Sequence, residues 1–227
     1  MTTLTLQPDA TDGIDTYVYE ASANANFGTG VTLSLIGYAA LRQRVLIKFD
    51  LSSIPAGATI DSATLTLYGQ GSGADNTPLA VHRILAASGS WTEAGATWNF
   101  QDGVARWAGD AASDGGTDAG CTQSGTDFSA TTMASGNFDN AAGVGTDYVL
   151  DVTEFALMVT ANYGLLVRNT TGVASATQPA SSDNATAAQR PKLVVEYTAT
   201  ASAPREVRTY AEGSLRWAEA SGTGGWT

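Results

Sequence analysis

Cysteine and histidine, two residues on which much enzyme chemistry depends, each occur only once in this chain of 227 residues. Cys121 cannot form an intrachain disulfide, and without a neighbouring His or Cys it is a weak candidate for a metal ligand or a nucleophile. His82 lies in the apolar pattern LAVHRIL, which favours a hydrogen-bonded histidine within a strand. The acidic residues lie mostly in turns, where local hydrogen bonding explains them. We therefore expect no enzyme.

Long apolar runs are also absent. No stretch approaches the roughly 20 residues that a transmembrane helix needs, so we expect no membrane insertion. The first residues, MTTLTLQPDATDG, have neither the basic region nor the apolar core of a signal peptide. We expect either a protein that is not exported by that route or a chain already cut to its mature form.

Basic residues are few. The chain has 11 Lys and Arg against 22 Asp and Glu, which gives a formal net charge of -11. A surface this acidic repels phosphate backbones and anionic lipids, so nucleic acids and membrane surfaces are poor partners. Hydrophobic residues make up 43% of the chain, which is enough for a sizeable core.

The clearest pattern is apolar alternation with a period of two. In VLIKFD, Val45, Ile47 and Phe49 fall on one face, and in ATLTLY, Leu65 and Leu67 do the same. We expect all five side chains inside. Strands are predicted at 3–7, 14–20, 31–36, 44–50, 60–69, 79–86, 147–152, 163–169 and 192–198. Without a βαβ rhythm, they predict an all-β fold: an antiparallel two-sheet β-sandwich, jelly-roll-like, with long loops and a C-terminal extension.

The chain divides into a sandwich domain at 1–198 and a linker with a docking tail at 199–227. A short helix is expected in DVTEFALMVTANYG, capped by Asp151 or Thr153. A long insertion at 99–146 has few aliphatic residues. We expect four of its larger side chains to pin it to the body: Trp107, Phe128, Met133 and Phe138.

Several motifs in order resemble the DNRLRE-domain family, a β-sandwich group that overlaps carbohydrate-binding modules. These are DTYVYEASANANFGTG, LIKFDLSSIPAGATIDSATLTLY, SWTEAGATWN, LDVTEF, NYGLLV and RPKLVVEY. The resemblance runs through residues 4–197. It implies a non-catalytic module that recognises surfaces, often glycans, and it leaves the ligand open.

Two kinds of small-ligand site are open. The loop DAASDGGTD carries Asp110, Asp114 and Asp118, which could supply oxygens to calcium; solvated turn residues are the alternative. For a sugar, exposed aromatic faces are needed. Family position suggests that Trp91 and Trp98 pack in the core. Trp107 and Tyr38 are then the better candidates for an exposed ligand contact.

The tail REVRTYAEGSLRWAEASGTGGWT balances three Arg with three Glu and holds a set of apolar side chains. It cannot bury these side chains by itself, so we expect it to dock on a neighbouring subunit, or else to fold back as one more strand of the sandwich. The expected partner-binding residues are Val207, Tyr210, Leu215, Trp217 and Trp226.

Three functional classes compete: structural virion component, glycan-binding module and enzyme. A bacteriophage protein needs no signal peptide and can be acidic on the particle surface, so we expect a decoration, fibre or tail subunit at the virion surface. Its partners would be other virion proteins or copies of itself, and cell-surface glycan is a further possible partner. The alternative is an extracellular carbohydrate-binding module. No cofactor is expected other than a possible calcium ion.

Overall fold

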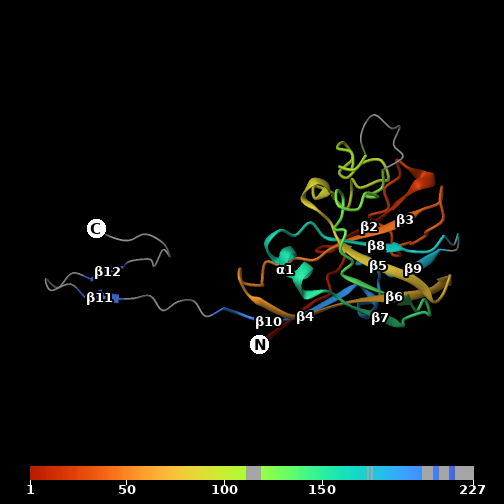
Figure 1. Cartoon of the computed structure of the whole chain (residues 1–227). Helices are drawn as coiled ribbons and strands as arrows, with labels where there is room; N and C mark the ends of the chain where they lie inside the picture. The colour runs from red at the N-terminus through yellow and green to blue at the C-terminus, as the bar shows by residue number, and fades with distance from the viewer. Residues whose placement is uncertain (111–118, 173, 175, 201–206, 210–214, 218–227) are drawn as a thin grey trace.

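Two antiparallel β-sheets pack face to face in the computed structural model of the chain (Figure 1). The structure describes residues 1–110, 119–172, 174, 176–200, 207–209 and 215–217. One sheet runs β1-β10-β4-β7, with β9 paired to β4, and the other runs β2-β3-β8-β5-β6. The predicted all-β sandwich is confirmed.

The strands of the first sheet are β1 (Thr2–Leu6), β10 (Lys192–Thr198), β4 (Thr59–Gly73), β7 (Gly145–Val149) and β9 (Thr177–Pro179). Those of the second are β2 (Ile14–Tyr19), β3 (Gln43–Lys48), β8 (Leu165–Asn169), β5 (Thr77–Arg83) and β6 (Ala134–Phe138). Helix α1 spans Val152–Thr160, and three 3-10 turns span Glu20–Ser22, Ala86–Ser88 and Ala187–Gln189.

The strand order is that of a jelly roll. Without β2 and β9, successive strands of the chain alternate between the two sheets, except that β5 and β6 are neighbours in the second sheet. Strands β1, β10, β4 and β7 thus face β3, β8, β5 and β6. Each sheet therefore joins strands from both ends of the chain, as two interleaved Greek keys require. The hairpin partner β2 extends the second sheet beyond β3.

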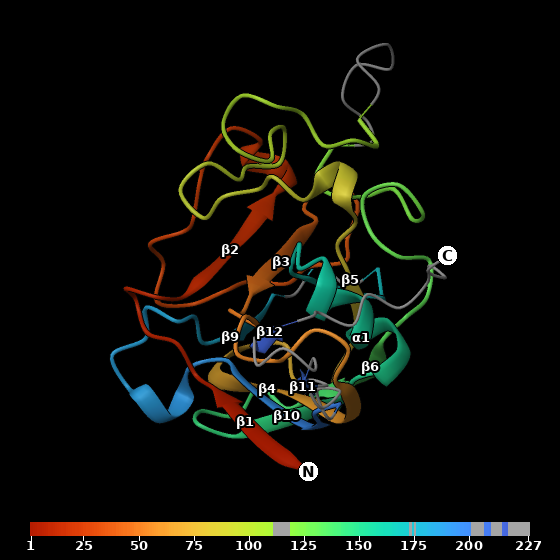
Figure 2. The ribbon, with the colours of Figure 1, turned by 90° about the vertical axis from the view of Figure 1, so that its left-hand side faces the viewer.

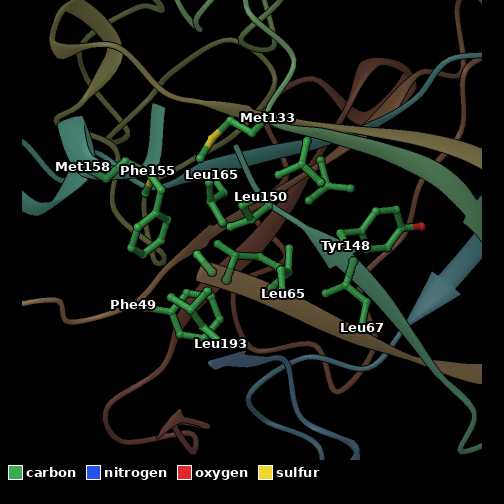
Figure 3. Close-up of a cluster of buried hydrophobic side chains, with 14 of the residues drawn as sticks. Phe49, Leu65, Leu67, Met133, Tyr148, Leu150, Phe155, Met158, Leu165 and Leu193 are labelled. Atoms are coloured by element: carbon green, nitrogen blue, oxygen red, sulfur yellow. The ribbon is translucent and has the colours of Figure 1, made fainter. Parts of the chain in front are cut away.

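The main core lies between the sheets. Val45, Ile47, Phe49, Leu65 and Leu67 are all buried there, as their alternation predicts. Figure 3 shows part of this cluster, in which side chains of both sheets meet those of helix α1. Alternation works here because one face of each strand packs on the opposite sheet.

Helix α1 covers one end of the core. Asp151 is its N-cap, and its carboxylate accepts a hydrogen bond from the backbone N–H of Glu154 at 2.9 Å. The helix turns Phe155 and Met158 into the core. One of the two predicted caps, Asp151, is thus the one used.

A second core lies on the outer face of the β2-β3-β8-β5 sheet. Residues 85–110 and 119–130, the yellow-green loops of Figures 1 and 2, cover this face, and we call these two segments the cap. Leu46 and Leu166 of the sheet are buried against it, although the alternation places Leu46 outward. The second core comprises Val18, Leu46, Ile84, Trp91, Ala96, Trp98, Trp107, Ala119, Cys121, Phe128 and Leu166.

Three elements differ from the sequence expectation. The predicted strand at 31–36 makes only isolated bridges, such as Leu35 to Thr177. Strands β6 and β9 have the compositions ASGNF and TQP, which carry no alternation, so the sequence did not predict them. The insertion is held as expected, since Trp107, Phe128, Met133 and Phe138 are all buried.

Strand β10, the last strand of the sandwich, ends at Thr198, and the division of the chain at residue 198 stays a prediction. Beyond it, β11 (Val207–Thr209) pairs antiparallel with β12 (Leu215–Trp217). Among the described residues, neither strand pairs with a strand of the sandwich. Of the predicted docking residues, Val207, Leu215 and Trp217 lie in this hairpin, and Tyr210 and Trp226 lie outside the described residues.

Candidate functional site

A polar pocket opens at the edge of the cap, where strands β3 and β8 run side by side. Its volume is about 220 Å³. One wall is the turn that leads into β3, and the other is the turn that follows β8. The lining residues are Ile36, Gly37, Arg42, Arg44, Arg168, Asn169, Thr170, Thr171 and Gly172.

Three of the 11 basic residues of this acidic chain converge on the pocket. Arg44 of β3 and Arg168 of β8 are direct partners in the antiparallel register. Like charges directly opposite each other destabilise a sheet. The fold must therefore offset the repulsion between the two guanidinium groups by other contacts.

Contacts within the protein fix two of the three guanidinium groups. Arg42 donates to both carboxylate oxygens of Glu20, Nε to Oε2 at 2.9 Å and Nη2 to Oε1 at 2.6 Å. Arg44 donates from Nη1 to the cap carbonyls of Cys121 at 2.7 Å and Gly120 at 3.3 Å. Burial lowers the pKa of Arg44 to about 10, so it still carries its charge at neutral pH.

Arg168 is held differently, by an uncharged side chain. Its Nε donates to Nε2 of His82 at 3.3 Å, and its guanidinium lies 5.7 Å from the centre of the Phe128 ring. Within the described part of the chain, neither Arg44 nor Arg168 forms a salt bridge. Two positive charges of the pocket therefore lack a described protein counter-ion.

An unused donor also lies beside the arginines. The Oδ1 of Asn169 accepts from the N–H and the hydroxyl of Thr171, at 2.8 and 2.7 Å. Its Nδ2 is buried and has no hydrogen-bond partner. A buried donor without an acceptor destabilises the folded protein unless a ligand or a water accepts its hydrogens. The pocket thus combines positive charge with a spare amide donor.

Gly37 lets the two walls of the pocket approach. A Cβ at this position would lie 1.7 Å from the carbonyl oxygen of Thr171. Any side chain here would push the turn before β3 away from the turn after β8. The pocket therefore depends on a glycine in the sequence LIGYAALRQR.

The two aromatic residues predicted to contact a ligand differ in exposure. Trp107 is only 1% exposed, and its Nε1 donates to the carbonyl of Thr97 at 3.0 Å, so the expectation of an exposed ring at Trp107 is wrong. The cap closes over it. Tyr38 is 48% exposed and directly follows Gly37 of the pocket wall.

Trp91 and Trp98 are core residues, as predicted. The ring of Trp98 also contacts two arginines of the pocket, because the guanidinium groups of Arg42 and Arg44 lie 5.3 and 5.7 Å from its centre. The sequence analysis missed the three arginines. The available signal was that Arg44 and Arg168 occupy outward positions in strands whose alternate residues are apolar.

The proposed calcium loop is only partly within the described residues. Asp110 is buried and pairs with Arg106 at 2.7 Å, while Asp114 and Asp118 lie outside the described residues. Over the described ranges, no group of three or more His, Cys, Asp or Glu side chains could hold a metal ion. The calcium site at Asp110, Asp114 and Asp118 stays a prediction.

The single cysteine and the single histidine are both buried. Burial raises the pKa of the Cys121 thiol well above its usual value, which opposes the reactive thiolate. His82 has hydrogen-bond partners at both ring nitrogens, as expected for a histidine within a strand.

None of the helices in the described parts of the chain is long and apolar enough to cross a membrane.

No curated protein matches the chain. The family model of carbohydrate-binding module family 96 matches residues 7–112. This range includes β2 to β5 and two of the pocket arginines, Arg42 and Arg44. Modules of this kind are generally non-catalytic and act outside the cell or at a surface. The match supports a carbohydrate-binding-module-like family for this chain.

Proposed function

We propose that this chain binds glycans without transforming them, and that the arginine pocket holds an acidic group of the glycan. The observation that carries this proposal is the direct pairing of Arg44 with Arg168, neither of which has a carboxylate partner among the described residues. Guanidinium groups bind carboxylates and sulfates through pairs of parallel hydrogen bonds. A sugar carboxylate or sulfate would offset the repulsion between the two arginines.

The pocket is small for a ligand site, because sites for drug-sized ligands start at about 300 Å³. We infer that it takes one charged substituent of a chain that lies across the surface. The exposed ring of Tyr38, next to Gly37, offers a face on which a neighbouring sugar ring can stack. Asn169 also lines the pocket, and its buried Nδ2 has no hydrogen-bond partner among the described residues.

Replacing Arg168 by Met should weaken binding of an acidic polysaccharide by about ten- to hundredfold, because a charge-assisted hydrogen bond is lost. Isothermal titration calorimetry with polygalacturonate and dextran sulfate measures the change, with uncharged dextran as reference. Arg168 is preferred over Arg44, since Arg44 also holds the cap carbonyls. Raising the salt concentration should weaken the binding of the wild type.

The matched control is Lys48→Met, which removes one positive charge from the outer face of the same sheet without touching the pocket. Lys48 lies against the ring of Trp91, at 5.9 Å, and does not line the pocket. We expect it to bind as the wild type does. Equal losses in both variants would mean binding by net charge alone, and unchanged binding in Arg168→Met would place the glycan elsewhere.

We further propose that the chain performs this function as a subunit on the surface of a phage particle. Support comes from the tail, where β11 and β12 pair with each other and with no described strand of the sandwich, as a separate docking element would. The partners would be other virion proteins or copies of itself.

Deleting residues 204–227 should leave the melting temperature of the sandwich unchanged and abolish assembly. Light scattering of the full chain and the truncated chain measures self-association. Mass spectrometry of purified phage particles measures whether each chain is incorporated into them. If the truncated chain is incorporated at full occupancy, the tail is not the attachment device. If the full chain is absent from particles, the phage role is wrong.

A further inference from the structure

His82 lies immediately behind the arginine pocket, although it does not line it. It belongs to β5, in which Ala80 is the register partner of Arg168 and His82 is that of Leu166. His82 and Arg168 are therefore diagonal neighbours on the same face of the sheet, close enough for side chains to meet. The His82 residue is only 2% exposed, and its Nε2 accepts from Nε of Arg168 at 3.3 Å.

The other ring nitrogen fixes which tautomer is present. Nδ1 lies 3.1 Å from the carbonyl oxygen of Ser129 and 3.3 Å from that of Thr131. Carbonyl oxygens only accept, so Nδ1 carries the proton, and Nε2 of the neutral ring is left as an acceptor. Arginine Nε only donates, so its contact requires the same tautomer. Two independent partners thus agree on one protonation state.

We propose that neutral His82 is a positioning residue that orients Arg168 for the ligand. This inference rests on the proposed function, since it assigns a role to a residue behind the same pocket. With its Nε engaged by His82, Arg168 keeps its terminal Nη groups, for which no described residue is an acceptor. These are the donors that a carboxylate or sulfate accepts from in a bidentate pair.

Protonation of His82 would end this arrangement. The charged ring has a proton on both nitrogens, so Nε2 could no longer accept from Arg168, and two cations would face each other. Among the described residues, the charged groups that face His82 are Arg168 of β8 and Arg44 of β3, and the segment Ser129–Thr131 at the end of the cap offers backbone carbonyls. Burial and then Arg168 lower the pKa of His82, which keeps the ring neutral at neutral pH.

The first test replaces His82 in the full chain and titrates dextran sulfate, whose sulfate groups stay charged in mild acid. His82→Leu removes the acceptor and should weaken binding about tenfold. His82→Gln offers an amide oxygen to Arg168 and should restore most of the affinity. Ile84→Val is the matched control, because it shortens a buried side chain of the second core and leaves Arg168 unchanged.

The pH profile separates positioning from a structural role. Wild-type affinity for dextran sulfate should fall as the pH is lowered below the ordinary histidine pKa of about 6.5, since the pKa of His82 is lowered by burial, and His82→Gln should show a flatter profile because it cannot take up the proton. Equal slopes in the two proteins, or wild-type affinity in His82→Leu, would overturn the role of His82 while leaving the glycan site intact. No binding of any acidic probe by the wild type would overturn both proposals.

A measurement without ligand tests the geometry itself. Nitrogen-15 chemical shifts of the single imidazole should report a neutral ring with its proton on Nδ1 at neutral pH. In Arg168→Met, the Nε2 acceptor loses its partner and its shift should change. A ring protonated on Nε2 in the wild type would contradict the inference, whatever the ligand is.

Discussion

The free energy of unfolding should fall as the pH rises from about 4 to about 8, and one buried carboxyl group should account for most of the change. This group is Asp15 of β2, which is 2% exposed. Burial raises the pKa of Asp15 to about 7, and the charges of Glu93 and Asp183 act in the same direction. Its hydrogen bond from the N–H of Ser182, at 2.7 Å to Oδ2, opposes the shift, and Oδ1 has no partner.

The sign follows from proton binding in the two states. In the unfolded chain the carboxyl group has its ordinary pKa near 4, so it loses its proton before the folded form does. The folded form therefore binds more protons between about pH 4 and about pH 7, and this stabilisation is lost as the pH rises through the folded pKa. A gap of about three pKa units corresponds to roughly 4 kcal/mol at most.

Asp15→Asn should remove this pH dependence. The amide oxygen can still accept from Ser182, and the amide group replaces the hydroxyl of the protonated acid as a donor. Urea unfolding at about pH 5 and about pH 8 should show a steep loss for the wild type and a small one for the variant. Asp50→Asn is the control, since the pKa of this fully exposed group is lowered by the N–H of Ser52. A wild type with equal stability at both pH values would contradict the prediction.

The sequence predicts the main core between the two sheets well, because the apolar alternation that forms it is a local pattern. Val45, Ile47 and Phe49 alternate along one strand, and the opposite sheet covers exactly one face of that strand. The second core could not be predicted in the same way. Leu46 lies on the outer face and is buried because the cap packs over it, which no local period encodes.

The arginine pocket, like the second core, depends on contacts between segments that are far apart in the sequence. Arg44 and Arg168 are ordinary outward residues in two strands that are far apart in the sequence, and only the pairing of β3 with β8 brings them together. That pairing follows from the jelly-roll order, which single-strand patterns do not determine. The exposure of Tyr38 was predicted from its turn, whereas the exposure of Trp107 was wrongly predicted because the cap that buries it has few aliphatic residues.

Trp107 should be important for stability rather than for contact with a sugar. Its ring packs among Trp98, Cys121 and Phe128 in the second core. Truncating a buried tryptophan to alanine leaves a large cavity and typically costs about 3–5 kcal/mol. We expect Trp107→Ala to lower the stability in urea by about this amount. Trp107→Phe keeps most of the packing but loses the hydrogen bond to Thr97, so it should lose only about 1–2 kcal/mol.

Tyr38→Ala is the reciprocal variant, because Tyr38 is about half exposed and directly follows Gly37 of the pocket wall. It should change stability by at most about 0.5 kcal/mol, as surface substitutions do, and weaken binding of acidic polysaccharide. Trp107→Ala should weaken polysaccharide binding only indirectly, by loosening the cap, because the cap carbonyls of Gly120 and Cys121 hold Arg44 in place. If Trp107→Ala instead keeps full stability and loses binding, the ring is a ligand contact and the cap opens in solution.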